Sequence, residues 1–436
     1  MRVVHVFCAS MMAAGLLVGA STASAQTPDA DAQQLRDAID QLKKDFDARL
    51  SALEGRLAAI EGREAPAAEA APPATAPAPE PPSTGGLQTP TDGSLPVYGA
   101  AAASSKIFNP DIGVIGNFIS ATGKSRGGSE SIAPIPFATL QESEASLQAI
   151  VDPYARADFF LALGEEGIEV EEGYVTFPTL PGGLRLKTGK MRANFGRLNA
   201  FHNHTLPWID RPLAMYNLLG GSPLDPDTGI KDAGVSASRI IPAGKLFVEA
   251  TGELFRGDSG TVFKSNRRSD FSTVGHLRAY ADVTEGTNIE IGGSYARGHN
   301  ELGSDFVTQL YGTDVTVRWR PLRRAIYRSL AARTELFWSR REEPAVLQEA
   351  FGGYASVDYG FRRRWFAGGR YDWSERATNA AIQDRGGSAV LTFWPSEFSQ
   401  VRGQYRRNRY GDDGRTANEL LLQVLFTIGA HGAHAF

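Results

Sequence analysis

Cysteine is almost absent from this chain of 436 residues, which contains only Cys8, so a fold that depends on disulfide bonds is excluded. Basic residues are not in excess: 45 Lys and Arg stand against 49 Asp and Glu, and the net charge of −4 argues against nucleic acid as a partner. After the first 25 residues there is no apolar run of roughly 18 residues, which excludes membrane-spanning helices. Membrane-spanning β-strands escape such a search, because their alternating pattern is averaged out.

Motifs of the common enzyme classes are also missing. The chain has no Gly-x-Ser-x-Gly elbow, no complete glycine-rich phosphate loop and no His-Glu-x-x-His zinc helix. We therefore expect no enzyme activity and no cofactor. A hydrolase that uses His276 and a nearby serine on a barrel wall is the alternative that a motif search leaves open.

The first 25 residues have the pattern of a secretory signal peptide. Arg2 precedes an apolar stretch from Val3 to Ala20, and Ala23-Ser24-Ala25 forms a small-residue cleavage site. We predict a signal at residues 1–25 and an exported chain that begins at Gln26.

Two further segments precede the aromatic-rich part of the chain. Apolar side chains recur every seven residues at Ile39, Phe46, Leu53 and Ile60. This heptad predicts a helical coiled coil at residues 26–63, with a single solvated amphipathic helix as the alternative. Residues 64–107 are rich in proline and alanine, which is typical of an extended linker.

Residues 108–436 alternate between apolar and polar side chains with a period of two, and we count sixteen candidate strands in them. Between Thr313 and Arg320, for example, Val315, Val317 and Trp319 alternate with polar and charged residues. The pattern predicts an all-β fold, a transmembrane antiparallel β-barrel of about 16 strands. A soluble β-sandwich is the alternative, but the inward-facing set is ionic on many strands, which favours a water-filled lumen.

The predicted connections alternate between short and long, as in outer-membrane barrels, whose turns are periplasmic and whose loops are external. Long loops are predicted at residues 121–138, 191–230, 257–272, 297–305, 340–350, 374–386 and 410–417. The last predicted strand, residues 418–428, and the terminal Phe436 resemble the assembly signal of such barrels.

Several short motifs resemble the phosphate-selective porin superfamily. They are Glu172-Gly173-Tyr174-Val175, Thr188-Gly189-Lys190 and Phe195-Gly196. The resemblance implies a signal peptide, a periplasmic coiled coil and a sixteen-stranded porin barrel.

A second set of motifs resembles the plug-less outer-membrane proteins that are labelled zinc-regulated TonB-dependent receptors. They lie at residues 108–112, 180–184, 202–204 and 429–436. This resemblance implies a receptor for zinc or metal chelates.

The longest predicted loop, residues 191–230, is the candidate constriction, because such a loop in porin-like barrels commonly folds into the lumen. Its candidate pore residues are Arg192, Arg197, Asp210 and Arg211. The wall residues expected to line the pore are Lys187, Arg278, Arg318, Arg370 and Arg402. The alternative is a solvated external loop with scattered charges.

His202 and His204 form a His-x-His pair, which in an extended segment points both rings to one side and makes them candidate metal ligands. Ordinary polar loop residues are the alternative interpretation. An acidic run is expected at the rim of the second external loop, either solvated or binding divalent ions with lipopolysaccharide. It consists of Glu165, Glu166, Glu169, Glu171 and Glu172.

Together these patterns predict a porin-like channel in the outer membrane of a Gram-negative cell, through which small hydrophilic solutes or ions diffuse passively. The expected partners are outer-membrane lipid, lipopolysaccharide and further copies of the chain in a homotrimer joined through the barrel and the periplasmic coiled coil. Two alternatives from other classes are a receptor for zinc or metal-chelate uptake and a structural tether to the cell wall, with peptidoglycan as its partner.

Overall fold

The structure is a computed structural model that describes Lys44 and residues 110–125, 137–164, 167–221, 228–411 and 414–429. The predicted signal peptide, the linker and, apart from Lys44, the coiled coil lie outside the described residues, and so does Phe436. The fold therefore concerns the domain that begins at Pro110.

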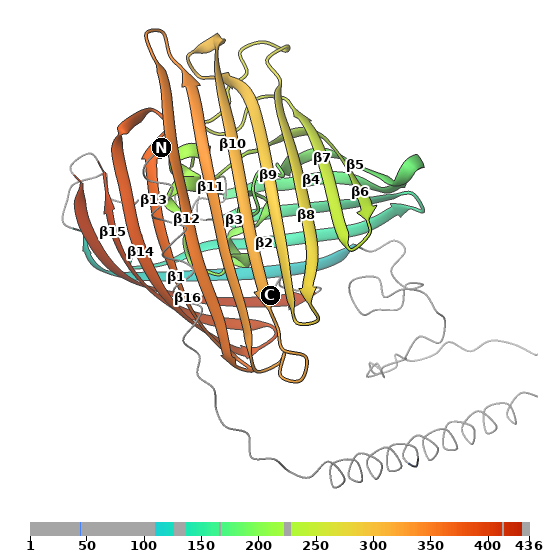
Figure 1. Cartoon of the computed structure of the whole chain (residues 1–436), viewed down its shortest axis with the longest axis vertical. Coiled ribbons are helices and arrows are strands. Elements are labelled where there is room, and N and C mark those ends of the chain that lie inside the picture. Colours follow the sequence, from blue (N-terminus) through green and yellow to red (C-terminus); the bar gives the residue numbers. More distant parts are fainter. Residues whose placement is uncertain are drawn as a thin grey trace, which may run out of the picture. The chain divides into compact units, whose positions relative to one another are not determined.

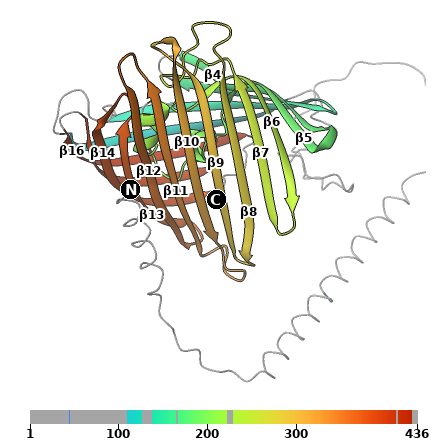
Figure 2. The ribbon, with the colours of Figure 1, turned by 45° about the horizontal axis from the view of Figure 1, so that its top comes forward.

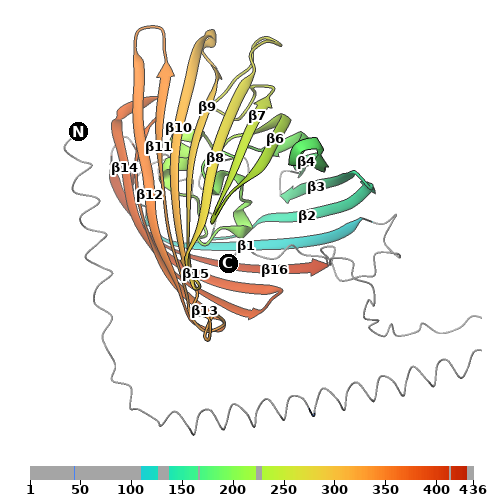
Figure 3. The same cartoon turned by 45° about the vertical axis from the view of Figure 1, so that its right-hand side comes forward.

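Within the described residues, sixteen antiparallel strands form one closed sheet (Figure 1). Their bounds are β1 (Asp111–Ser125), β2 (Ala138–Asp152), β3 (Ala155–Gly164), β4 (Gly167–Leu180), β5 (Leu184–Arg192), β6 (Lys231–Ala243), β7 (Leu246–Phe255), β8 (Ser272–Thr284), β9 (Thr287–Asn300), β10 (Gly303–Trp319), β11 (Ser329–Glu342), β12 (Leu347–Arg362), β13 (Trp365–Arg376), β14 (Asn379–Ser396), β15 (Ser399–Tyr410) and β16 (Arg415–Gly429). Each strand pairs with its neighbours in the chain, and β1 also pairs with β16, so the ring is closed (Figure 3). The predicted barrel of about 16 strands is confirmed, and a two-sheet sandwich is excluded.

The two faces of the sheet follow the period-two pattern of the sequence. On β9, Glu290 is 5% exposed, whereas its neighbour Ile291 is 53% exposed. On β16, the exposed residues are Leu420, Leu422, Val424, Phe426 and Ile428, whereas Leu421 and Leu425 between them are buried. An apolar outer face with a polar lumen face is the arrangement that a surrounding bilayer stabilises. Among the described helices, none is long and apolar enough to cross a membrane.

Several connections differ in length from the prediction. Three predicted long loops, at residues 297–305, 340–350 and 374–386, are tight turns between strands that continue further than expected. Their strand ends are polar but still paired: Gln309 lies opposite Arg297, and Arg340 opposite Glu349 with a 3.0 Å ion pair. The pattern was misleading because polar strand ends look like loops in the sequence, although their backbone continues the ladder. In the opposite sense, the connection between β10 and β11, which is one of the short ones in the alternating pattern, spans residues 320–328.

The connection between β5 and β6 is long, as predicted, and carries its own secondary structure. It contains the 3₁₀ turns η4 (Leu198–Ala200) and η5 (Asn203–Thr205) and the helix α3 (Leu213–Leu219), whereas the turn η3 (Pro181–Gly183) joins β4 to β5. The turns η4 and η5 and the helix α3 lie within the ring of strands (Figures 1 and 2). We call residues 193–230 the constriction loop; its residues 222–227 lie outside the described residues.

Candidate functional site

The constriction loop crosses the lumen and contacts strands from all round the barrel. The backbone N–H of Gly196 donates to Ser294 Oγ on β9 at 2.8 Å, and that of Leu198 donates to Glu335 Oε1 on β11 at 3.1 Å. Further along the loop, the N–H of Ile209 donates to Gln404 Oε1 on β15 at 2.8 Å. The loop is thus held by inward-facing side chains of strands that are far apart in the sequence.

Apolar packing fills the space between the loop and these strands. The ring of Trp208 lies 5.4 Å from that of Tyr354 on β12, and Phe195 stacks on Phe337 of β11 at 5.9 Å. Trp208 and Phe195 are fully buried. A solvated external loop does not fit this burial, because such a loop would not hide large aromatic side chains from water.

The middle of the loop, at Asp210, is fixed to a basic part of the wall. Asp210 Oδ1 lies 3.1 Å from Arg370 Nη2 on β13, and Asp210 Oδ2 lies 2.9 Å from Arg406 Nη1 on β15. Gln404 Nε2 donates to Asp210 Oδ1 at 2.6 Å. Burial would raise the pKa of Asp210, but the two guanidinium groups outweigh it and hold the pKa below its ordinary value. Asp210 is therefore a buried carboxylate that binds two buried arginines.

The same basic wall holds the loop backbone. Arg402 Nη1 donates to the carbonyl oxygens of Leu206 at 2.8 Å and Trp208 at 3.1 Å. The guanidinium of Arg370 also lies over the Trp208 ring, 4.8 Å from its centroid. Arginine suits this role because its planar fork donates to several acceptors at once.

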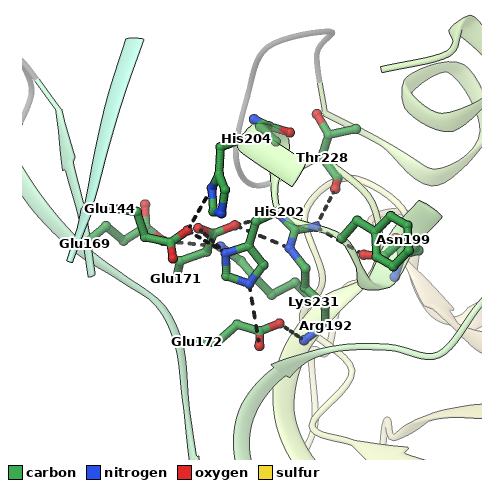
Figure 4. A network of polar contacts seen from close by, with 12 residues as sticks. Glu144, Glu169, Glu171, Glu172, Arg192, Asn199, His202, His204, Thr228 and Lys231 are labelled. Carbon is green, nitrogen blue, oxygen red and sulfur yellow. Dashed lines mark hydrogen bonds and ion pairs between the residues drawn. The ribbon is translucent and has the colours of Figure 1, made fainter. Parts of the chain in front are cut away.

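The segments where the loop begins and ends meet an acidic part of the wall, formed by β2 and β4 (Figure 4). Arg192 Nη2 pairs with Glu171 Oε1 at 2.9 Å, and both side chains are 1% exposed. Arg192 Nη1 donates to the carbonyl oxygen of Thr228 at 3.0 Å, and the Arg192 backbone N–H donates to Glu172 Oε1 at 2.8 Å. This arginine joins both ends of the loop to β4.

The two histidines of the His-x-His pair lie in this acidic region. His202 Nδ1 is 2.6 Å from Glu144 Oε2 on β2 and 3.4 Å from Glu171 Oε2 on β4, and His204 Nδ1 is 3.3 Å from Glu144 Oε2. Burial alone would lower the pKa of His202, but Glu144 and Glu171 raise it well above its ordinary value. The residues placed so that they could hold a metal ion are His202, His204, Glu144, Glu142 and Glu171.

Below the loop, toward the rim of short turns, the lumen contains a cavity of about 310 Å³. Five arginines and one aspartate line it: Arg197, Arg318, Arg320, Arg333, Arg402 and Asp358. A second hollow of about 680 Å³ at the rim shares Arg320, Ser329, Phe366 and Trp394 with the first. It is also lined by Arg328, Arg362, Arg363 and Arg364. Arginine side chains therefore follow the lumen from the loop to this rim.

The structure separates the nine predicted pore residues into three groups. Arg197, Arg318 and Arg402 line the cavity. Arg192, Asp210 and Arg370 are buried in the contacts that hold the loop, and so is Arg211, which is 0% exposed and donates to the loop's own carbonyl oxygens of Leu198 and Phe201. Lys187, over the Tyr174 ring at 4.4 Å, and Arg278, paired with Glu249, lie on the wall outside that lining.

The acidic partners of the loop differ from what the sequence suggested. Glu171 and Glu172, expected on a solvated rim, are 1% and 6% exposed inside the barrel, whereas Glu169 is exposed and pairs with Lys190 at 3.2 Å. Glu165 and Glu166 lie outside the described residues. The spacing of Glu142 and Glu144, two apart on a strand, was the available signal for inward carboxylates on β2.

Comparison with known proteins places the chain in a family. It is 30% identical over 410 residues to an uncharacterized protein of Aquifex aeolicus (strain VF5), covering 80% of this chain and 85% of that protein. The chain belongs to the same family as this Aquifex protein. No family model matches the chain, so membership of the phosphate-selective porin superfamily is not established.

Solved structures with this fold are outer-membrane channels. OprB of Pseudomonas putida has a TM-score of 0.50 at 10% identity, with 74% of this chain and 95% of that chain covered. The outer membrane channel DcaP of Acinetobacter baumannii has a TM-score of 0.50 at 11% identity, with 76% and 100% covered. At this identity the likeness shows the fold, that of a porin-like outer-membrane barrel.

Proposed function

We propose that the chain forms a channel for the passive diffusion of small hydrophilic solutes across the outer membrane, with a preference for anions. The observation that carries this proposal is the cavity between the constriction loop and the short-turn rim, which five arginines line. A solute that crosses the barrel must pass this charged surface, and charges that line a pore select the ions that pass.

Charge balance in the cavity supports the anion preference. Arg197 and Arg318 both pair with Glu290, and Arg333 pairs with Asp358, so two carboxylates offset part of the charge of the five arginines. Among the residues that line the cavity, the five arginines therefore outnumber the one carboxylate, Asp358. Because the walls have a low dielectric, the field of these charges is focused in the lumen, where it raises the local concentration of anions.

The proposal is tested by planar-bilayer recording with refolded full-length protein. In a KCl gradient we expect steady conductance and a reversal potential of the sign for chloride permeation. A folded barrel without conductance would overturn the channel, and a cation-selective reversal potential would overturn the anion preference while leaving the channel in place.

Several finer predictions belong to the same proposal. A homotrimer, contacts with lipopolysaccharide and a periplasmic coiled coil at residues 26–63 are typical of the porin resemblance and are expected for this chain. Native mass spectrometry of the detergent-extracted protein, with and without residues 26–63, measures both the oligomeric state and the part the coil has in it. The tether to peptidoglycan predicts that the same deletion releases the barrel from sedimenting cell wall.

Uptake of zinc or a metal chelate is a second candidate function. It is favoured by the position of His202 and His204 beside Glu144 within the lumen, with His204 also lining the cavity. Zinc influx into proteoliposomes that are loaded with a fluorescent zinc chelator tests this second function. Influx no faster than that of Mg²⁺ would leave general diffusion as the function.

A further inference from the structure

The acidic part of the wall, where the constriction loop contacts β2 and β4, holds more buried carboxylates than buried Lys and Arg side chains. Its four buried carboxylates, each at most 6% exposed, are Glu142, Glu144, Glu171 and Glu172. Arg192 and Lys231 are the buried cations with fixed charge among them (Figure 4). Ionised carboxylates are not stable in a buried site unless cations or donors compensate them, and the two carboxylates in excess can be compensated by the two histidines or by a bound cation.

Some of the carboxylate oxygens in this cluster have no hydrogen-bond donor. Both carboxylate oxygens of Glu142, and Oε2 of Glu171, are buried without a donor among the described residues. One oxygen from each of Glu142, Glu144 and Glu171 lies within 4.8 Å of the others. Carboxylate oxygens that converge in this way, some of them without a hydrogen-bond donor, are arranged as the ligands of a cation are arranged.

Two imidazole nitrogens join the carboxylates at spacings that suit a metal ion. Donor atoms around a tetrahedral Zn²⁺ with bonds of about 2.1 Å lie about 3.4 Å apart. The separation from His204 Nδ1 to Glu144 Oε2 is 3.3 Å, and that from His202 Nδ1 to Glu171 Oε2 is 3.4 Å. The His202 Nδ1 to Glu144 Oε2 separation of 2.6 Å is a hydrogen bond, which must widen when an ion takes the place of the proton.

We propose that one divalent transition-metal ion of the Zn²⁺ type binds between His202, His204, Glu144 and Glu171. Glu142 lies beside this set as a further oxygen donor or charge-balancing group. Imidazole nitrogen together with carboxylate oxygen favours Zn²⁺ and its neighbours over Ca²⁺ and Mg²⁺, which prefer oxygen alone. His202 binds the ion through a free lone pair on Nδ1, so any proton on that nitrogen passes to solvent.

The ion is a resident of the protein and not a solute in transit. Its carboxylate ligands Glu144 and Glu171 come from β2 and β4 and are 3% and 1% exposed, and its two histidines come from the constriction loop. A bound ion therefore cross-links the loop to the barrel wall. Since His204 also lines the lumen cavity, the site has a path by which the ion can enter. This inference rests on the proposed role of the loop as the constriction of a channel.

Metal content of the refolded full-length protein tests the proposal. The protein is stripped with EDTA, equilibrated with zinc sulfate in the presence of millimolar MgCl₂, desalted and measured by inductively coupled plasma mass spectrometry. We expect a single zinc ion per chain in the wild type. The His202→Ala/His204→Ala double variant should bind at least about tenfold more weakly, and Glu142→Gln should bind with reduced affinity. Zinc should also slow proteolytic cleavage between residues 193 and 230 in the wild type alone.

Two matched controls change other histidines. The His299→Ala variant, on β9, and the His431→Ala/His434→Ala variant, near the C-terminus and outside the described residues, should bind zinc as the wild type does. Heat-modifiable migration on SDS gels shows that each barrel is folded, and His202→Gln/His204→Gln replaces the alanine pair if that pair does not fold. Zinc content well below one ion per folded wild-type chain, or equal content in the double variant, would overturn the site. Because binding is measured without conductance, a barrel that binds zinc but does not conduct would overturn the channel alone.

Discussion

Two parts of the barrel wall hold the same loop with opposite charges. On the acidic part, carboxylates of β2 and β4 surround Arg192, His202 and His204. On the basic part, arginines of β13 and β15 surround Asp210. The loop thus presents basic groups to the acidic wall and a carboxylate to the basic wall. Reversing the loop would bring like charges together in a buried site, so the charges select one orientation of the loop.

The two parts differ in how completely their charges are paired. Asp210 is shared by two arginines, each of which has a second carboxylate partner: Asp372 for Arg370 and Glu419 for Arg406. The acidic part instead keeps carboxylate oxygens without donors. Each charged group of the basic part therefore has a partner of opposite charge, although Asp372 Oδ1 and Arg406 Nη2 make no hydrogen bond, whereas neither carboxylate oxygen of Glu142 in the acidic part has a donor among the described residues. The difference separates a purely structural contact from a candidate binding site.

The largest expected effect comes from Asp210→Asn, which breaks the ion pairs between the loop and the basic part of the wall. Arg370 and Arg406 would lose a shared buried counter-charge, and removal of one partner from a buried ion pair costs about 3–5 kcal/mol. We expect that loss in the free energy of local opening of residues 193–221, measured by native-state hydrogen exchange with mass spectrometry. Asp305→Asn, at an exposed position, is the control. Unchanged exchange in the loop would show that apolar packing alone holds it.

Arg192→Met, which breaks the contact with the acidic part of the wall, should lower the free energy of local opening by less, about 2–3 kcal/mol. Glu171 loses its guanidinium partner but keeps His202, whose Nδ1 lies 3.4 Å away, as a second cation. The same hydrogen-exchange measurement compares the basic and the acidic contacts of the loop directly. Arg340→Met, which removes one partner of an exposed ion pair with Glu349, should change the opening free energy by less than about 1 kcal/mol. An effect of Arg192→Met larger than that of Asp210→Asn would reverse the ranking of the two contacts.

Much of the barrel was predictable because two solvents act on alternate residues. Lipid selects apolar side chains such as Ile291 and Leu422, and the lumen selects polar ones such as Glu290. Each strand is therefore visible in the sequence as a segment that alternates with a period of two, and these segments can be counted. Strand ends were less predictable. Gln309 and Arg340 pair in the ladder beyond the apolar band, where neither solvent imposes alternation, and their hairpins therefore read as loops.

The candidate site was predictable only from one side. Arg192, Asp210 and His202 could be recognised in the sequence as charged or titratable residues of the longest predicted connection. Their partners could not, because the closure of the barrel brings those partners into contact with them. Glu144 is 58 residues from His202, and Arg406 is 196 residues from Asp210. No local pattern links positions so far apart, and a glutamate run such as Glu171-Glu172 looks the same in a sequence whether it is solvated or buried.

A smaller effect is expected on selectivity when the basic side of the cavity is neutralised. Arg318→Gln/Arg333→Gln removes two cavity charges and leaves Glu290 and Asp358 with less compensation. The ratio of chloride to potassium permeability, obtained from the reversal potential in a KCl gradient, should fall by about threefold or more. Lys245→Gln, in the exposed turn between β6 and β7, should leave the ratio unchanged. A ratio insensitive to the two arginines would mean that permeating ions do not pass this cavity.

The smallest effect, and the sharpest contrast between the two walls, is expected from pH. The charged groups that face Asp210 are Arg370, Arg406 and Asp372, the phenol of Tyr216 also lies close to it, and Glu419 is a second partner of Arg406. Because the folded-state pKa of Asp210 lies below its ordinary value of 3.8, its contribution to loop packing is complete above about pH 4 and is lost as the pH falls through the lower, folded-state pKa. While the ion pairs of Asp210 hold the loop, the conductance of the wild-type channel should be constant from pH 7 to pH 5. It should rise only below about pH 4, where protonation of Asp210 releases the loop. In Asp210→Asn the conductance should already be raised at pH 7 and should show no such step. A wild-type step near pH 6 that persists in Asp210→Asn would assign the pH response to the acidic contacts of the loop instead.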